Sequence, residues 1–292
     1  MSSSKTELPS IKKVYSTTAK SFKNNPALFV PFLIFAIVEF ISLIIIYLAP
    51  RMPLRLILGP PIRTFWGERF LHYPFNFLLL PKLLNLSRMA LAVVFSSLLT
   101  GAAVAMVFDV YSKKHPKLSA CLKSGLKRYI HLFAIVLIFT GLFYFLGKII
   151  TQGLLKYFMA GHTRLLFLRA GIWMGPILTC INFLLALLIQ SAFIYAIPIL
   201  MIEEEKLIKS IVKSFILFKK LFIKTLILVG LPMLLYIPIM VLLNNSAFLI
   251  SNVFPESILL VLILGGIISS LIIDPIVTIS TTFLYLMNKE KK

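Results

Sequence analysis

Charged residues and cysteines are scarce in this chain of 292 residues. Only 14% of the residues are charged and 59% are apolar, whereas soluble domains are commonly about one quarter charged and about half apolar. This composition excludes a soluble enzyme, because too few polar residues are present to cover a water-exposed surface. Two cysteines are too few for a disulfide scaffold, and the high apolar content excludes a disordered chain. The chain has long apolar runs instead, which are typical of a polytopic membrane protein.

Six of these apolar runs are long enough to cross a membrane as helices, since a hydrocarbon core about 30 Å thick needs roughly 20 residues. They are Ala27–Ala49, Met89–Tyr111, Tyr129–Ile150, Met174–Ile202, Leu221–Leu243 and Ser257–Met287. Lipid offers no partner to backbone polar groups, and the alternating pattern of a membrane β-barrel is missing from these runs. The sequence therefore predicts an all-α fold, a polytopic membrane helical bundle that forms one domain over residues 1–292.

Acidic residues are scarcer than basic ones, with ten Asp and Glu against thirty Lys and Arg and a formal net charge of +20. Most of the basic residues lie at the chain ends and in alternate connections, which six spans place on one side of the membrane. Basic residues favour the cytoplasmic side, so we expect a multi-pass protein of the cytoplasmic (inner) membrane with both termini in the cytoplasm. This distribution explains the positive charge without nucleic acid as a partner.

A short pattern occurs three times, in which Lys-Ser is followed seven or eight residues later by Leu-Phe and an apolar run. The three pairs are Lys20-Ser21, Lys123-Ser124 and Lys213-Ser214. We predict three internal repeat units, residues 8–111, 115–202 and 204–288, each with a basic amphipathic helix and a hairpin of two spans. Such a helix is expected in the membrane interface, with its apolar face in lipid and the lysines near anionic headgroups. A docking surface for a cytoplasmic protein is the alternative.

Two carboxylates lie near the middle of expected spans, Glu39 in the first and Asp274 in the last. An ionisable group at that depth costs up to about 2.5–3.5 kcal/mol, so it should face the bundle or water. Ser270 and Thr278 share a helix face with Asp274. No Lys or Arg lies at the same depth, so we expect no buried ion pair. The carboxyl groups are expected to be protonated and hydrogen-bonded, for example to Gln190, or to face a hydrated cavity. They have either a structural role or a role in handling protons or cations.

Arginine is concentrated on the other side of the predicted membrane. Five arginines lie in the long connection between the first two spans: Arg51, Arg55, Arg63, Arg69 and Arg88. They are candidate contacts for anions or lipid headgroups, because the guanidinium group binds phosphate and carboxylate through two hydrogen bonds. Chance placement is the alternative. The same connection carries Phe-Leu-Leu-Leu, which predicts that it lies in, or dips into, the membrane interface.

No motif for catalysis or metal binding occurs, neither HExxH nor GxSxG, and the four histidines are scattered. We therefore expect no enzyme activity, no metal and no cofactor.

Two segments carry a resemblance to a known group of proteins. They are AIPILMIEEEKLIKSIVKSFILFKKLF at residues 196–222 and DPIVTISTTFLYL at residues 274–286. They resemble six-helix integral membrane proteins that include the membrane domain of glycerophosphoryl diester phosphodiesterases and related stand-alone bacterial proteins. In that group a span ends in Pro, apolar residues and Glu, and leads into a helix with Ser near a basic residue. The resemblance implies the hairpin layout but no activity, since the phosphodiesterase catalytic domain has no counterpart in this sequence.

These observations predict a non-enzymatic integral membrane protein that contacts lipids or acts as a scaffold in the cell envelope. Membrane lipids, with anionic headgroups on the cytoplasmic side, and envelope proteins are the expected partners. The alternative is a secondary transporter or channel that uses Glu39 and Asp274, because repeated units and midplane carboxylates occur in transporters.

Overall fold

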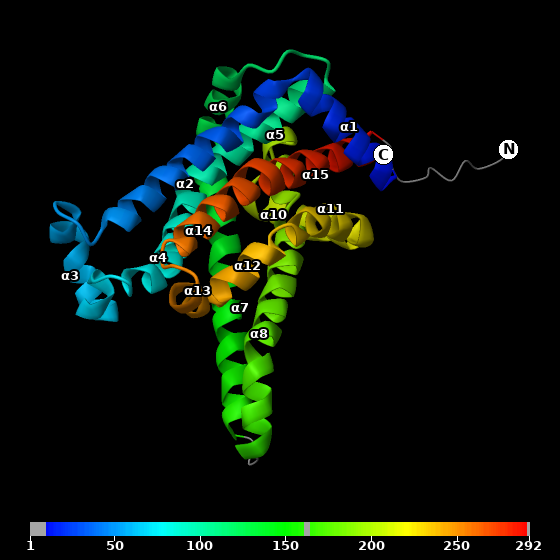
Figure 1. Cartoon of the computed structure of the whole chain (residues 1–292). Helices are drawn as coiled ribbons and strands as arrows, with labels where there is room; N and C mark the ends of the chain where they lie inside the picture. The colour runs from blue at the N-terminus through cyan, green and yellow to red at the C-terminus, as the bar shows by residue number, and fades with distance from the viewer. Residues whose placement is uncertain (1–9, 161–163, 291–292) are drawn as a thin grey trace.

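The computed structural model describes residues 10–160 and 164–290, so the first two residues of the predicted unit 8–111 lie outside it. The structure is 87% helical and the described residues contain no strand, which confirms the all-α class. Most helices form a bundle, and α7 (Tyr129–Ala160) and α8 (Arg164–Phe193) project from it as a long hairpin (Figure 1). The first and last described helices lie close together in the same view.

Five stretches of helix are long and apolar enough to cross a membrane. They are Pro26–Leu48, Asn76–Tyr111, Tyr129–Gly153, Gly175–Ile202 and Ser257–Lys289. The first consists of η1 (Pro26–Phe29) and α2 (Val30–Leu48), and the second of α4 (Asn76–Leu91), η3 (Ala92–Ser96) and α5 (Ser97–Tyr111). The third lies within α7, the fourth contains the end of α8 and all of α9 (Ala196–Ile202), and the last consists of α14 (Ser257–Ile267), η4 (Ile268–Ile273) and α15 (Asp274–Lys289). A sixth span exists if α11 (Phe222–Leu234) and α12 (Ile237–Asn244) count as one, although they meet at a bend of 52°. The residues that the structure describes thus contain five to six candidate membrane spans.

The connection between the first two spans, which was expected to lie in or dip into the membrane interface, is largely helical. It contains α3 (Leu54–Trp66) and the 3₁₀ helix η2 (Glu68–Leu71). The second span begins at Asn76 instead of Met89, because the Phe-Leu-Leu-Leu run forms the start of α4. These apolar side chains pack inside the protein, where Phe77, Leu79 and Leu80 are buried. Beyond α12, the short α13 (Ser246–Asn252) leads to the last span.

Three short basic helices cover the ends of long helices. They are α1 (Ile11–Asn24), α6 (Leu118–Lys127) and α10 (Leu207–Lys220). Helix α6 packs against α5, and α10 packs against α9, in each case the helix that precedes it in the chain. Helix α1 packs against α15, the last helix, so the same pairing joins the two ends of the chain (Figure 1). We call the end of the bundle that holds these three short helices the terminal end.

Small residues form the buried side of the short helices at matching places. Each has a small buried residue seven positions before a buried leucine: Ser21 and Leu28, Gly125 and Leu132, Ser214 and Leu221. In the middle copy the buried small residue is Gly125. The Lys-Ser pattern pointed to Ser124, so the structural repeat is shifted there by one residue. The connections after α5 and α9 are also alike. Each enters the left-handed backbone region two residues past the helix end, at Lys113 (φ 57°) and Glu204 (φ 58°).

The apolar faces of the short helices do not all point outward. In α1 and α6 these faces pack on a buried cluster, which includes Val14 and Cys121. The prediction of a lipid-facing side is therefore wrong for α1 and α6, since neighbouring long helices already cover that side. Helix α10 differs, because its small serines face the bundle while Ile208, Val212 and Ile216 are exposed.

Irregular turns interrupt each of the long helices that return to the terminal end. Helices α4 and α5 are joined by the π-helical turn η3, and α14 and α15 are joined by the π-helical turn η4. Helices α8 and α9 are separated by a turn at residues 194–195. Such π-helical turns displace side chains from the regular helix pattern and are frequent at functional sites. In this protein the residues around them line a cavity.

Candidate binding cavity in the helical bundle

A cavity of about 360 Å³ lies between the long helices. Helices α2, α4, α5, α7, α8, α9 and α15 contribute to its walls, together with the turns η3 and η4. Five phenylalanines supply much of the apolar lining: Phe32, Phe35, Phe139, Phe143 and Phe193. Hydroxyl groups come from Ser96, Thr100, Thr140, Ser269, Thr278, Thr281 and Thr282. The charged residues of the lining are Glu39, Arg88 and Asp274.

The cavity brings together the polar residues selected from the sequence. Glu39, Gln190, Asp274 and Thr278 all line it. The fifth, Ser270, is buried in η4 and donates a hydrogen bond to Oε2 of Glu39 at 2.5 Å. No hydrogen bond joins Gln190 to either carboxylate among the residues that the structure describes. Gln190 thus contributes to the wall and is not the partner that the sequence suggested.

Glu39 forms a buried ion pair with Arg88, which contradicts the expectation of no such pair. Nε of Arg88 lies 2.9 Å from Oε1 of Glu39, and Nη2 of Arg88 lies 3.3 Å from Oε2. The side chains of Arg88 and Glu39 are only 19% and 10% exposed. Nη1 of Arg88 also donates to the hydroxyl of Tyr236 at 3.3 Å. Arg88 therefore links α2 to the bend between α11 and α12.

The expectation failed because Arg88 had been placed just outside the second span, as a contact for outer anions. In the structure α4 starts at Asn76 and continues through η3 into α5, so Arg88 lies well inside a long helix. Its guanidinium group is oriented into the bundle, where it meets Glu39. A signal was present in the sequence: the apolar run at residues 77–80 is unsuited to a loop in water and suits the start of a helix.

Two consecutive glycines allow close approach in this region. A methyl group added at Gly266 would lie 3.5 Å from Nη2 of Arg88. One added at Gly265 would lie 2.8 Å from Cγ2 of Ile239, which is closer than side chains approach in folded proteins. Glycine at 265 thus lets α14 pack directly against α12.

Asp274, the first residue of α15, faces the cavity without a bonded partner. Among the described residues, no hydrogen bond or ion pair involves its carboxylate. It is near enough to Glu39 and Arg88 to interact with both electrostatically. Glu39 and Arg88 neutralise each other, so an ionised Asp274 gives the described part of the lining one net negative charge.

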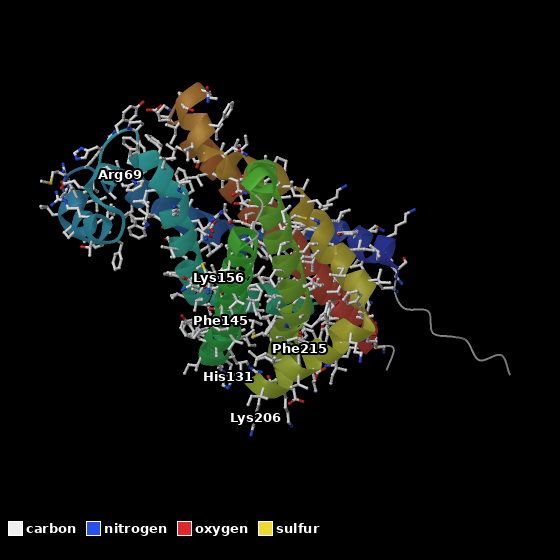
Figure 2. The ribbon with its side chains drawn as sticks, turned by 90° about the horizontal axis from the view of Figure 1, so that it is seen from below. Arg69, His131, Phe145, Lys156, Lys206 and Phe215 are labelled. Atoms are coloured by element: carbon white, nitrogen blue, oxygen red, sulfur yellow. The ribbon has the colours of Figure 1, made fainter. Side chains whose placement is uncertain are left out.

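The other four arginines predicted as outer anion contacts lie away from the cavity and have partners within the protein. Arg55 and Arg63 approach the same carboxylate, Glu68, at 3.9 and 3.1 Å. Arg51 lies over the ring of Tyr47 and Arg69 over that of Phe70, with centroid distances of 5.7 and 5.0 Å. Arg69 is at one edge of the molecule, far from the labelled residues of the terminal end such as His131 (Figure 2). The structure does not bring the five predicted arginines into one site.

The terminal end holds a second polar cluster, centred on Glu203 directly after α9. Nζ of Lys213 lies 2.7 Å from Glu203 and 2.7 Å from Glu205. The hydroxyl of Tyr285 donates to Glu203 at 2.6 Å, and Lys289 lies 3.6 Å away. Burial alone would raise the pKa of Glu203, but the hydrogen bonds and the lysine charges outweigh burial and lower it. Glu203 thereby joins α9, α10 and α15.

Of the three lysines predicted at the interface, Lys213 therefore forms ion pairs with carboxylates of the protein itself. Hydrogen bonds from its ammonium group to Glu203 and Glu205 raise its pKa. Lys20 and Lys123 are exposed, as a headgroup contact requires.

No group of three or more His, Cys, Asp and Glu that suits a metal ion occurs in the part of the chain that the structure describes. Comparisons with protein families, with curated proteins and with solved structures find no match to this chain. The resemblance to membrane domains of glycerophosphoryl diester phosphodiesterases therefore stays a prediction.

Proposed function

We propose that this protein is a non-enzymatic membrane transport protein of the secondary type, in which the cavity between the long helices binds the solute. The observation that carries the proposal is Asp274, an unpartnered carboxylate that faces a cavity of about 360 Å³ inside the candidate spans. Pockets for small molecules have volumes of about 300–1,000 Å³. An ionisable residue at membrane depth that faces a cavity is typical of an ion or substrate pathway.

The interrupted helices around the cavity support this proposal. Substrate sites of secondary transporters commonly form where helices are broken and where repeated units meet. Here η3 contributes Ser96 and η4 contributes Ser269 to the cavity wall. The matching pairs at the terminal end, in which α1, α6 and α10 cover α15, α5 and α9, support three repeat units.

Proteoliposomes test transport directly. Purified protein is reconstituted with trapped pyranine, and proton flux is followed during imposed gradients of sodium, potassium or benzyltrimethylammonium. The proposal expects cation-dependent proton flux that Asp274→Asn abolishes and that Glu68→Gln, a surface control, retains. Thermal unfolding of both variants shows whether each is folded. Flux that persists in folded Asp274→Asn, or no flux from any gradient, would count against a transporter that uses Asp274.

A second candidate role, contact with membrane lipids, is favoured by α10. Ile208, Val212 and Ile216 form an exposed apolar row, 73%, 51% and 64% exposed, and exposed Lys209 and Lys219 belong to the same helix. A basic amphipathic helix beside a membrane is stabilised when it lies in the interface. Such contact is also compatible with a scaffold for envelope proteins.

Lipid quenching tests the contact made by α10. A bimane label is placed on Ile208→Cys in a background without the two native cysteines, and vesicles contain brominated lipid. We expect strong quenching at this position and weak quenching for the same label at Lys209→Cys. Equal quenching at both positions would show that α10 has no lipid-facing side.

We also propose that both termini lie in the cytoplasm and that the protein resides in the cytoplasmic membrane. The concentration of lysine at the terminal end supports this orientation. A reporter fused after Lys292 that is active only in the cytoplasm tests it, and activity on the opposite side would reverse the orientation.

A further inference from the structure

The aromatic lining of the cavity indicates which class of solute it suits. Phe32 and Phe35 come from α2, Phe139 and Phe143 from α7, and Phe193 from α8. Phe139 and Phe193 meet edge to face, with ring centroids 6.1 Å apart. Aromatic rings attract cations through their negatively charged faces, and several rings around one site are a recognised arrangement for quaternary ammonium groups.

The charges of the lining favour a cation over an anion. Arg88 is the only cationic side chain among the described lining residues, and Glu39 holds it by two hydrogen bonds. Asp274 has no such partner in the described structure. A ligand with a positive group gains the attraction of Asp274, whereas an anionic ligand must compete with Glu39 for Arg88.

The size and composition of the cavity favour an organic cation over a metal ion. A hard metal ion is held by about six or more oxygen atoms placed close around it. The described lining instead combines three charged side chains with a largely apolar wall, and no metal-binding group was found among the described residues. A space of about 360 Å³ is far larger than one dehydrated ion needs.

We propose that the cavity binds a small hydrophobic organic cation, with its ammonium group against Asp274 and its apolar body among the phenylalanines. This inference rests on the proposed use of the cavity as the solute site. Glu39 and Arg88 neutralise each other beside the ligand, so that the net attraction comes from Asp274.

Equilibrium binding to the intact protein in lipid nanodiscs tests this inference without transport. The probe is radiolabelled benzyltrimethylammonium, and empty nanodiscs correct for partition into lipid. We expect saturable binding that excess unlabelled probe displaces and that neither sodium nor benzenesulfonate displaces. Benzenesulfonate has a similar aromatic body and the opposite charge, so displacement by it would overturn the charge argument.

Three variants locate the bound probe. Asp274→Asn is expected to weaken binding at least tenfold, and Phe139→Leu severalfold. Asp274→Glu keeps the charge and should retain most of the affinity, which covers the case in which the asparagine variant fails to fold. Glu68→Gln, outside the cavity, should bind as the unmodified protein does.

The outcomes separate this inference from the proposed function. Proton flux without benzyltrimethylammonium binding would overturn the organic cation and leave transport in place. Saturable binding that depends on Asp274 but occurs without flux would uphold the ligand class and refute transport. Binding that is unchanged in both Asp274→Asn and Phe139→Leu would overturn the inference, because the probe would then bind elsewhere.

Discussion

Replacement of Arg88 by methionine is expected to destabilise the protein more than any neutralisation of its partner Glu39. In Arg88→Met the carboxylates of Glu39 and Asp274 face one cavity with no cation between them. Breaking a buried ion pair by removing one partner costs about 3–5 kcal/mol, because a buried charge is left uncompensated. The change also removes the hydrogen bond from Arg88 to Tyr236.

Glu39→Gln is expected to cost less, about 1.5–3 kcal/mol, which is the range for loss of a hydrogen bond to a charged group. This variant leaves one cation, Arg88, and one carboxylate, Asp274, within electrostatic range of each other. The double variant Glu39→Gln with Arg88→Met should lose clearly less free energy of unfolding than the sum of the two single losses, since neither charge of the pair is then stranded.

The free energy of unfolding is measured in mixed micelles by titration with dodecyl sulfate, followed by circular dichroism. Arg63→Met is the control, because its pair with Glu68 is about half exposed on both sides. A pair of that kind contributes at most about 1 kcal/mol. If Arg88→Met is no more destabilised than Arg63→Met, the ion pair does not exist as described. If Glu39→Gln lowers the free energy of unfolding as much as Arg88→Met does, Asp274 does not balance the charge of Arg88.

Three further predictions concern packing and titration at the terminal end and beside it. Gly101→Ala should lower the free energy of unfolding by about 1–3 kcal/mol, because the new methyl group would lie 2.6 Å from the side chain of buried Leu132. Denaturant titration measures this loss, and an unchanged midpoint would mean that the Leu132 side chain can shift without cost. The pKa of Glu203 is lowered in the folded protein. Its ion pairs therefore contribute their full stabilisation at a pH above the ordinary glutamate pKa of about 4.3. This stabilisation is lost as the pH falls through the lower pKa of the folded state. Thermal unfolding from pH 7 to 3 should show this loss, and Glu203→Gln should reduce it. Burial and the nearby Asp109 raise the pKa of Cys121 to about 12, so alkylation by iodoacetamide at pH 7 should be slow and should accelerate in Asp109→Asn.

Much of the fold could be predicted from the length of the apolar runs, because the thickness of the hydrocarbon core sets the length of a membrane span. The expected spans and the long helices overlap throughout, and α1, α6 and α10 occur where basic amphipathic segments were expected. The fifth span was harder to predict. Pro232 and Pro238 lie on the two sides of its bend, and proline interrupts a helix by removing a backbone donor. Whether they kink one span or end it depends on the packing of neighbouring helices.

The cavity could be predicted only in part. Glu39 and Asp274 could be selected because each is an isolated charged residue in an apolar run. The free-energy cost of exposing such a group to lipid predicts that it faces the interior of the bundle. Arg88 itself did not stand out in this way, since a basic residue next to an apolar run is normally a boundary marker, and the only clue was the apolar run before it at residues 77–80. The aromatic wall was also hidden, because phenylalanine is common on lipid-facing surfaces. Only the relative rotation of the helices decides which rings, such as Phe139, face inward.

The position of the cavity relative to the terminal end bears on how a solute would reach it. On the terminal side a buried cluster of α1, α5, α6, α9 and α15 closes the bundle, with Tyr195 and Phe283 almost fully buried. The ion pairs of Glu203 hold α10 and α15 together at the same end. Phe32 belongs both to this cluster and to the cavity wall, so the two are directly adjacent. If the cavity carries a solute as proposed, passage toward the terminal end would require the short helices to separate from the long ones. The small residues at their contacts, such as Ser214, interlock less than large side chains would.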